Sequence, residues 1–398
     1  MSVAPTNLTK RTIAVFTGNR AEYGLQVPIL RAIAADPRLE YQLLVSGAHL
    51  KDDFGRTLHE IEADGFVVHH EVRIDMGGDS LQMTAQAIGT AVISLSGILG
   101  EQRPDFLVVY ADRFESFAAM IAGTQMGIPT AHIEGGDYTE GGALDDSVRH
   151  AMTKLAHLHF TTNEHAADRV RRMGEELWRV HNVGLPSLDQ VAAGDFPSPE
   201  DVYRRYGLDP TRPILIFTQH SVATEFDRAD EQVRPSIAAL EDAARYWGCQ
   251  VIVTYPNDDA GGRRIMRELE QLKARDVSGV QVHRSLGRSN YHGVLHVATA
   301  CLGNSSSGIK ETPAFHCACI DIGPRQQGRL RAENVIQVPY DTSAIKQAIW
   351  RCLHDDAFRA QVRGCANPYL AGNAGRRIAD VLASTPIDAR LIQKRMTY

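Results

Sequence analysis

Short apolar runs alternate with longer amphipathic stretches twice along this chain, and this pattern constrains its fold more than any other feature. The first half has six apolar runs of strand length, at 12–17, 41–46, 66–71, 106–110, 128–133 and 159–162. Helical spacing appears between these runs, in Leu25–Ala35, Leu81–Glu101 and Ser116–Met126. Strands that alternate with helices form βαβ units, so the pattern predicts a parallel sheet covered by helices on both faces.

A proline-rich stretch separates this pattern from a second one. GDFPSPEDVYRRYGLDPTRP (194–213) is predicted to be a linker region, and strand-like runs follow at 214–218, 251–255, 280–283, 300–303, 318–322 and 335–338. At 398 residues the chain exceeds the size at which a single core stops growing. We therefore predict an α/β protein with the GT-B fold, in which two Rossmann-like domains face each other across a cleft. The N-terminal domain is predicted at 1–193, completed by a C-terminal helix at about 375–398, and the second domain at 194–374.

Composition excludes several classes of protein. A hydrophobic content of 43% and a charged content of 23% are those of a soluble globular chain. A net charge of −6 argues against a nucleic-acid partner, which requires a basic face. No apolar run has the length expected of a membrane span, so we expect no membrane partner. Six cysteines without a CxxC pair indicate reduced thiols and a cytoplasmic location, and we predict no structural metal and no cofactor.

The segment HIEGGDYTEGGALDDSVRHAMTKLAHLHF (132–160) gathers acidic residues at one edge of the predicted sheet. It brings Glu134 to the end of an apolar strand, and Asp145 and Asp146 then open an amphipathic helix after a glycine-rich turn. Open α/β folds bind ligands at the carboxyl ends of their strands. The segment therefore predicts acid–base carboxylates there, although an ordinary acidic helix start would give the same aspartate pair.

Two other loops are predicted to lie at the same edge. YADRFES places Asp112 and Arg113 after the strand FLVVY, near Glu134. Two carboxylates in one cleft can have their pKa values driven apart, so that one acts as acid and the other as base. A structural Asp-Arg ion pair is the alternative. TGNRAEYG places Arg20 at a helix N-terminus, where an anion could bind, unless Arg20 is simply a surface ion-pair partner.

The second half carries candidate contacts for a diphosphate. His220, in TQHSVATE, could donate to a phosphate or transfer a proton, or could be a solvated loop residue. In LGNSSSGIKET, Ser305, Ser306 and backbone N–H groups converge after a strand, with Glu311 one turn later as a candidate partner for ribose hydroxyls. A polar turn with serine caps is the alternative. Arg325, Arg329 and Arg331 follow the next strand and could reach the same anion. The second half thus suits a nucleotide diphosphate, and the first half suits chemistry on what the nucleotide carries.

These residues resemble the hydrolysing branch of the UDP-N-acetylglucosamine 2-epimerase family. The matching motifs are NRAEYG, SGAHLKDDFG, DRFES, HIEGGD, DDSVRHAMTKLAHLHF, VGLPSLD, TYPNDDAGG and GNSSSGIKE with GPRQQGRLRAEN. The resemblance implies a GT-B fold and a homodimer or homotetramer. It also implies a two-step reaction on a UDP-aminosugar: elimination of UDP to a glycal, then hydration with inversion at C2. The product would be free N-acetylmannosamine, or a diacetamido analogue, for sialic acid and related nonulosonates.

By motif, the resemblance assigns acid–base chemistry to Asp112, Glu134, Asp145 and Asp146. It places His220 and Arg113 at the diphosphate or sugar, and Arg20, Ser305, Ser306 and Glu311 at the nucleotide. Arg329 joins these as a predicted substrate contact. Two positions depart from the family pattern, because Ala111 replaces the usual glycine and Ser221 an often-found proline. UDP-N,N'-diacetylbacillosamine therefore remains an alternative substrate, and a GT-B glycosyltransferase an alternative of another class.

Overall fold

The computed structural model describes residues 10–50, 57–74, 81–137, 144–257 and 260–398 of the chain. Contacts between residues divide it into two compact units. Unit 1 contains the chain up to Asp137, Asp145–Asp189 and Ala371–Tyr398, and unit 2 contains Leu144 and Gln190–Leu370. Helices α5 (Leu144–Leu155) and α7 (Ser187–Ala192) cross these limits and are given below with unit 1, where they begin or mostly lie. The domain limits expected at 193/194 and 374/375 remain predictions.

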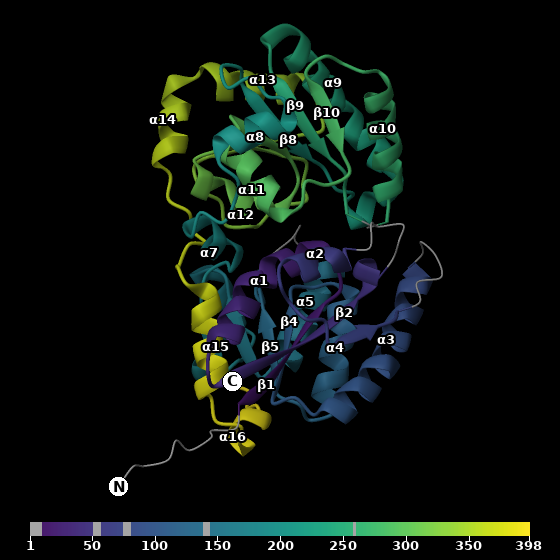
Figure 1. Ribbon diagram of the computed structural model, residues 1–398, viewed down its shortest axis with the longest axis vertical. Helices are drawn as coiled ribbons and strands as arrows, with labels where there is room; N and C mark the ends of the chain where they lie inside the picture. Colours follow the sequence, from purple (N-terminus) through teal and green to yellow (C-terminus); the bar gives the residue numbers. More distant parts are fainter. Residues whose placement is uncertain (1–9, 51–56, 75–80, 138–143, 258–259) are drawn as a thin grey trace. The chain divides into compact units, whose positions relative to one another are not determined.

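Within its described residues, unit 1 is built on a seven-stranded parallel sheet in the order β3-β2-β1-β4-β5-β6-β7. Figure 1 labels its strands β1, β2, β4 and β5. The strands are β1 Arg11–Thr17, β2 Leu39–Ser46, β3 His70–Val72, β4 Phe106–Tyr110, β5 Thr130–Ile133, β6 Leu158–Thr161 and β7 Val180–Asn182. The helices are α1 Arg20–Ala35, η1 Gly47–Leu50, α2 Leu58–Ala63, α3 Leu81–Gln102, α4 Phe114–Gln125, α5 Leu144–Leu155, α6 Glu164–Arg172, η3 Leu177–Arg179, α7 Ser187–Ala192, α15 Ala374–Ser384 and α16 Ala389–Ile392.

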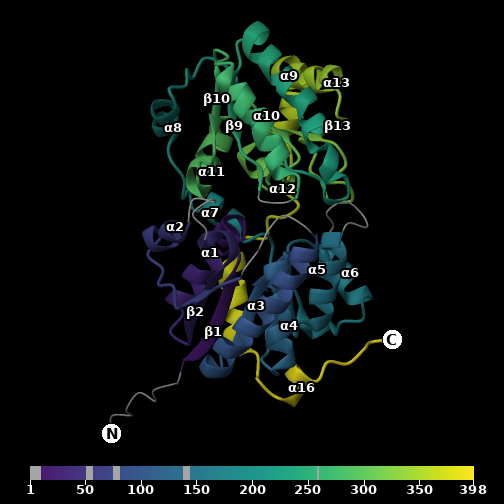
Figure 2. The same ribbon diagram turned by 90° about the vertical axis from the view of Figure 1, so that its right-hand side faces the viewer.

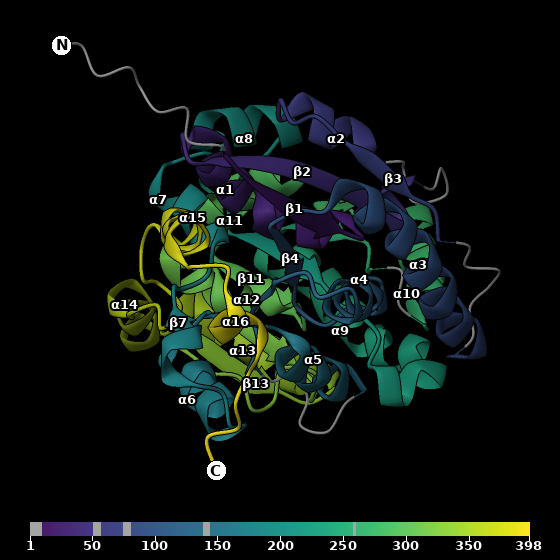
Figure 3. The same ribbon diagram turned by 90° about the horizontal axis from the view of Figure 1, so that it is seen from below.

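Alternate residues of the strands supply two separate cores in unit 1. Val15 and Val108 point to one face of the sheet, which α1 and the C-terminal helix α15 cover side by side (Figure 3). Phe16 and Leu107 point to the other face, which α3 and α4 cover (Figure 2). Both faces of a parallel sheet are thus buried, which is why its strands are nearly continuous apolar runs.

Unit 2 repeats the strand order of the first six strands of unit 1. Its described residues form a six-stranded parallel sheet in the order β10-β9-β8-β11-β12-β13. The strands are β8 Ile214–Thr218, β9 Gln250–Thr254, β10 Val280–His283, β11 Ala300–Gly303, β12 Ala318–Ile322 and β13 Val335–Val338. The helices are α8 Pro199–Tyr206, η4 Ala223–Arg228, α9 Ala229–Trp247, α10 Gly262–Ala274, α11 Arg288–Val297, α12 Ser306–Lys310, η5 Thr312–Phe315, α13 Thr342–His354 and α14 Asp356–Gly364. Two Rossmann-like sheets in one chain confirm the predicted α/β class.

The stretch predicted to be a linker is instead part of unit 2. Ser198 caps α8 by accepting a hydrogen bond from the Asp201 N–H, Pro199 begins the helix, and Gly207 ends it in a left-handed conformation. Val202 and Leu208 are buried in a core cluster with Ile214. Prolines and a glycine mark the ends of a short helix here, because proline is compatible with a first helical turn and glycine with the residue after the last.

Helix α3 is, among the described residues, the one helix long and apolar enough to cross a membrane, with a mean hydropathy of 1.4 over Gln82–Gln102. The sequence was not expected to contain such a stretch. Its Ala87, Ala91, Leu95 and Leu99 are fully buried in the core beneath α4. This packing is that of a helix that covers a sheet.

The structure also changes some of the predicted boundaries. Helix α1 begins at Arg20 rather than Leu25, because the Asn19 side chain caps it by accepting from the Glu22 N–H at 3.1 Å. The strand expected at 66–71 is β3, only His70–Val72. The short strand β7 was not expected, since its three residues are too few to show a periodicity.

Candidate functional site

Asp112 and Glu134 follow two strands that lie next to each other in the sheet of unit 1. Tyr110 at the end of β4 pairs with Ile133 at the end of β5, so the residues that follow leave the sheet at the same edge. The backbone turns sharply at both places, since Ala111 has a φ of 55° and Glu134 a φ of 68°. A left-handed conformation is unfavourable for residues other than glycine, and it marks both turns as locally strained.

Arg149 links the carboxylates of two different elements. It lies on α5, one turn after Asp146, and only 1% of it is exposed. Its Nη2 forms an ion pair with Asp112, and its Nη1 contacts Asp146 Oδ1 at 2.6 Å and the carbonyl of Asp137 at 2.9 Å. A planar guanidinium can hold two carboxylates at once in fixed directions. Asp112 and Asp146, which the sequence predicted to share an edge, are therefore brought together by a residue that the prediction did not single out.

The buried side chain of His132 connects the turn after β4 to helix α5. Its Nε2 lies 2.7 Å from the carbonyl oxygen of Ala111, and its Nδ1 lies 3.1 Å from Thr153 Oγ1. A carbonyl only accepts, so Nε2 carries the proton and Nδ1 accepts from the threonine hydroxyl. Burial, which is complete, lowers the pKa of His132 to about 3 despite the hydrogen bond to Ala111. The ring is thus neutral at physiological pH and positions the Ala111–Asp112 turn.

The other predicted residues of unit 1 lie at the starts of helices. Asp145 is in the first turn of α5, while the glycine-rich turn before it, residues 138–143, lies outside the described residues. Arg113 precedes α4, and its Nε lies 3.3 Å from Glu115 Oε2. Arg20 is the first residue of α1, and the position of its side chain lies outside what the structure describes.

In unit 2, Asn304 joins three loops at the carboxyl edge of the sheet. Its side chain accepts from the His220 N–H at 2.7 Å and donates to the His220 carbonyl at 2.9 Å. Its carbonyl accepts from Arg325 Nη1 at 3.1 Å and from Gln326 Nε2 at 2.8 Å. The loops after β8, β11 and β12 are therefore fixed to one another, which a sequence pattern alone does not reveal.

The ring of His220 has a defined tautomer when neutral. The Asn257 N–H donates to its Nδ1 at 3.0 Å, so the ring proton is on Nε2. His220 is 7% exposed. At the end of β11, Gly303 has a φ of 121°, and a Cβ atom there would lie 1.9 Å from the carbonyl oxygen of Thr218, two residues before His220. Only glycine allows β11 to approach β8 this closely.

The serine-rich turn lies where the sequence predicted it. Ser305 precedes α12 and Ser306 begins it, and both are half-buried. Glu311 follows α12 and is 6% exposed; its Oε2 accepts from Ser307 Oγ at 2.6 Å and lies 3.5 Å from His292 Nε2. These contacts fix the direction of the Glu311 carboxylate. His292, on α11, carried no signal in the sequence.

The three arginines after β12 have different surroundings. Arg331 donates to Asp321 Oδ2 at 2.8 Å and to Gln337 Oε1 at 2.9 Å, and so is anchored to the sheet. Arg329 is buried, and its positive charge helps to lower the pKa of the buried Lys310 ammonium well below its usual value, after burial itself. Burial raises the pKa of Asp321 to about 6, although the three arginines act in the opposite direction.

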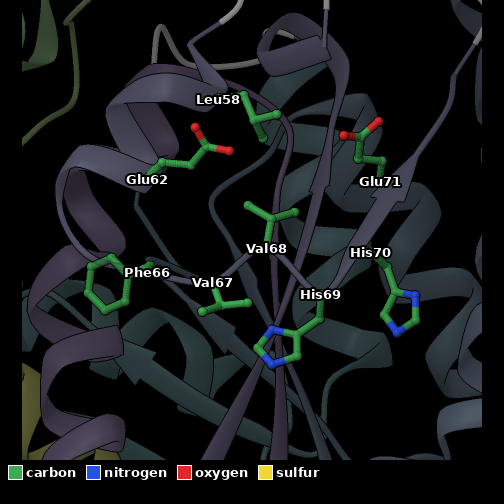
Figure 4. A pocket seen from close by; sticks show the side chains of 8 residues that line it. All are labelled: Leu58, Glu62, Phe66, Val67, Val68, His69, His70 and Glu71. Carbon is green, nitrogen blue, oxygen red and sulfur yellow. The ribbon is translucent and has the colours of Figure 1, made fainter.

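A surface hollow of unit 1 lies apart from the predicted site residues. It lies between α2 and the edge strand β3, and its lining shares no residue with the predicted site (Figure 4). Leu58, Glu62 and residues 66–71 line it. The predicted carboxylates therefore lie elsewhere, at the ends of the central strands.

Arg149 is the residue that the sequence could have revealed. In DDSVRH it stands three residues after Asp146, a spacing at which helical side chains of opposite charge meet. Asn304 and His292 act through residues far away in the chain, so no local spacing reveals them.

Comparison with known proteins shows the family to which the chain belongs. The chain matches the family described as UDP-N-acetylglucosamine 2-epimerase over residues 31–383. It is 31% identical to a UDP-N,N'-diacetylbacillosamine 2-epimerase (hydrolyzing) from Legionella pneumophila, across 98% of this chain and 100% of that protein. It is also 31% identical to a UDP-N-acetylglucosamine 2-epimerase from Neisseria meningitidis, across 88% of this chain and 89% of that one.

A solved structure extends the likeness to the fold. The UDP-GlcNAc 2-epimerase from Neisseria meningitidis bound to UDP-GlcNAc is similar with a TM-score of 0.78 at 16% identity, covering 94% of this chain and 99% of that chain. Two Rossmann-like sheets in a fold shared with these enzymes are the GT-B architecture. With this fold, this sequence match and a relative named as hydrolysing, the chain belongs to the UDP-N-acetylglucosamine 2-epimerase family, in its hydrolysing branch.

Proposed function

We propose that this protein hydrolyses and epimerises a UDP-N-acetylaminosugar, converting UDP-N-acetylglucosamine and water to N-acetylmannosamine and UDP. The observation that carries the proposal is the group at the edge of the unit 1 sheet, where Arg149 contacts both Asp112 and Asp146 beside the strand that delivers Glu134. Family membership supplies the class of reaction.

The proposed reaction has two steps that balance without a redox partner. First, a carboxylate takes the proton from C2, the C1–O bond breaks, and UDP leaves with the bonding electrons, giving a glycal. Second, water adds its oxygen to C1 while C2 receives a proton on the opposite face, which inverts C2. Protons must therefore be removed from C2 in the first step, returned to C2 in the second and removed from the attacking water, and we assign these transfers to Asp112, Glu134, Asp145 and Asp146.

The remaining predicted residues are assigned to binding in this proposal. His220, whose ring proton is on Nε2, and Arg113 would contact the diphosphate or the sugar. Arg20, Ser305, Ser306 and Arg329 would contact the nucleotide, and Glu311 would accept from the ribose hydroxyls. The fixed direction of the Glu311 carboxylate supports this, because a preorganised acceptor loses little entropy on binding.

Two further assignments belong to the same proposal. The product would serve the biosynthesis of sialic acid or a related nonulosonate in the cytoplasm; the six free, buried cysteines fit a reducing compartment.

We also propose a homodimer or homotetramer. Along α3, the small residues Ala85, Gly89 and Gly97 and the 74% exposed Ile93 share one solvent-facing row. Ile93→Glu should then yield a smaller species in light scattering, and an unchanged mass would argue against this interface.

The sugar's substituents are the open part of the proposal, since the two relatives at 31% identity are named for different sugars. We favour UDP-N-acetylglucosamine and keep UDP-N,N'-diacetylbacillosamine as the second candidate. Incubation of the protein with each UDP-sugar alone, in deuterium oxide, tests the choice by NMR of the products. We expect deuterium at C2 of a free, 2-epimerised sugar and an equal amount of UDP. A sugar still attached to UDP, or an untouched substrate as for a glycosyltransferase without acceptor, would refute hydrolytic epimerisation.

A further inference from the structure

Two glutamates outside the proposed acid–base set are buried together at the carboxyl edge of the unit 1 sheet. Glu22 lies in the first turn of α1, after β1, and Glu115 in the first turn of α4, after the neighbouring strand β4. Each is 3% exposed. Buried carboxylates are costly unless they are bonded or neutral, so their presence in pairs requires an explanation.

Glu22 connects the two turns. Its Oε2 accepts from the Gly18 N–H at 2.9 Å, and its Oε1 lies 3.0 Å from Ser116 Oγ on α4. One carboxyl group therefore ties the turn that leads into Arg20 to the helix that follows Arg113. Both arginines belong to the proposed substrate-binding set.

Glu115 is enclosed by two glycines and faces an arginine. A Cβ atom on Gly18 would lie 2.9 Å from Glu115 Cβ, and one on Gly47 would lie 3.0 Å from Glu115 Oε1 and 2.3 Å from the Gly18 carbonyl oxygen. The glycines after β1 and β2 thus make room for this carboxylate. Its Oε2 accepts from Arg113 Nε at 3.3 Å, and this contact restricts the guanidinium.

Among the residues that the structure describes, Arg113 is the cation that acts on both carboxylates, so two ionised glutamates would share its guanidinium. Burial and then the charge of Glu115 raise the pKa of Glu22 to about 7, against the lowering effects of Arg113, the Gly18 N–H and Ser116. Among the described residues, His49 of η1 is a further titratable group at this edge, and it lies between the hydroxyls of Thr17 and Thr57. Near neutral pH, the Glu22 carboxyl can therefore carry a proton.

We propose that Glu22 and Glu115 form a positioning pair for the reaction: Glu22 ties the β1–α1 turn to α4, and Glu115 holds Arg113 toward the substrate. The inference rests on the proposed function, because Arg113 acts there on the anionic part of the UDP-sugar. Neither glutamate transfers a proton to the substrate. A second negative charge on Glu22 would compete for Arg113 and loosen its position.

Kinetics of single and double variants test the pair. Glu115→Gln removes the charge that holds Arg113 and should raise KM about tenfold with kcat changed far less, since charged hydrogen bonds contribute about 1.5–3 kcal/mol. Arg113→Gln should raise KM as well, and the double variant should be no worse than Arg113→Gln alone. Additive effects in the double variant would overturn the proposal.

The pH profile tests Glu22 separately. In the wild type, KM should rise as the pH increases through about 7. Glu22→Gln, which has nearly the same shape and is never charged, should keep the KM of the wild type at pH 6.5 and lose this rise. Glu62→Gln, at an exposed glutamate on α2, is the matched control and should keep the rise. A rise that persists in Glu22→Gln would show that another group titrates.

Failure of the proposed function is distinguishable from failure of the pair. If the wild type turns over no UDP-aminosugar, the proposal of hydrolytic epimerisation is wrong. The pair is then tested by calorimetry, which gives the dissociation constant of UDP for the same variants in place of KM. Weaker UDP binding in Glu115→Gln, without further loss in the double variant with Arg113→Gln, would still support the pair. UDP binding that none of the substitutions changes would overturn it.

Discussion

The carbonyl oxygen of Ala111 accepts a hydrogen bond from Nε2 of His132 at 2.7 Å, although Ala111 has the backbone conformation of a glycine. The hydrogen bond and the left-handed conformation together fix the backbone of the turn from which Asp112 leaves β4. The family resemblance implies a glycine at this position, and the left-handed φ of Ala111 gives this departure a physical cost.

Ala111→Gly should relieve this strain. A left-handed conformation costs a non-glycine residue about 1–2 kcal/mol, and glycine loses about 0.4–1 kcal/mol more entropy on folding. We therefore expect urea denaturation to give a free energy of unfolding that is unchanged or up to about 1 kcal/mol higher. The same substitution at Ala360, exposed within α14, should lower it by about 1 kcal/mol. Equal losses at both positions would contradict the assigned strain.

His132 should make the protein less stable in acid. Its pKa of about 3 in the folded protein lies below the ordinary 6.5, so only the unfolded chain takes up this proton between those values. The contribution of the neutral ring is complete above pH 6.5 and is lost as the pH falls toward 3. Between pH 7.5 and 5, the wild type should lose about 2 kcal/mol more stability than His132→Gln, which cannot titrate. If urea denaturation gave the wild type and His132→Gln the same loss in the free energy of unfolding between pH 7.5 and 5, His132 would not be responsible for the acid sensitivity.

Arg149→Met should be among the most damaging single substitutions in unit 1. It leaves Asp112 and Asp146 without their shared buried cation, and removing one partner of a buried pair typically costs about 3–5 kcal/mol. Arg149→Lys should recover only part of this, because an ammonium does not present a planar fork. Arg172, whose side chain is 79% exposed in a surface pair with Asp168, provides the control. If Arg172→Ala lowered the melting temperature as much as Arg149→Met, the bridging role would be wrong.

Asp112→Asn and Glu134→Gln test proton transfer. Each keeps the shape of the side chain and most hydrogen bonds, while general acid–base catalysis is worth about 10²–10⁴ in rate. Both variants should bind UDP and unfold cooperatively, yet lose kcat by at least about 10². One of them could release glycal without hydrating it, which NMR would detect. Near-normal turnover in both variants would make the carboxylates structural.

Glu311→Ala should weaken binding and leave the chemical step intact. The ribose hydroxyls that Glu311 is proposed to bind do not change during the reaction, so the loss should appear in KM with kcat nearly unchanged. Glu333→Ala, at an exposed position of unit 2, serves as the comparison. A fall in kcat at constant KM would contradict a ribose contact.

The sequence alone determined the order of the elements and the edge at which the chemistry lies. Apolar runs and helical spacing are local properties, and parallel strands all end at the same edge, so the places of Asp112, Glu134 and Ser305 followed from the chain direction. Where elements were very short, as in β7, or where prolines marked helix ends, as in α8, local patterns predicted the wrong structure or none.

The tertiary structure decided which groups meet and which carry charge. Arg149 reaches Asp112 and Asn304 reaches His220 only because separate strands bring their loops together. Burial makes His132 neutral and lets Glu22 keep a proton near pH 7. These properties depend on the solvent and the neighbours that a side chain has after folding, and no spacing along the chain encodes them.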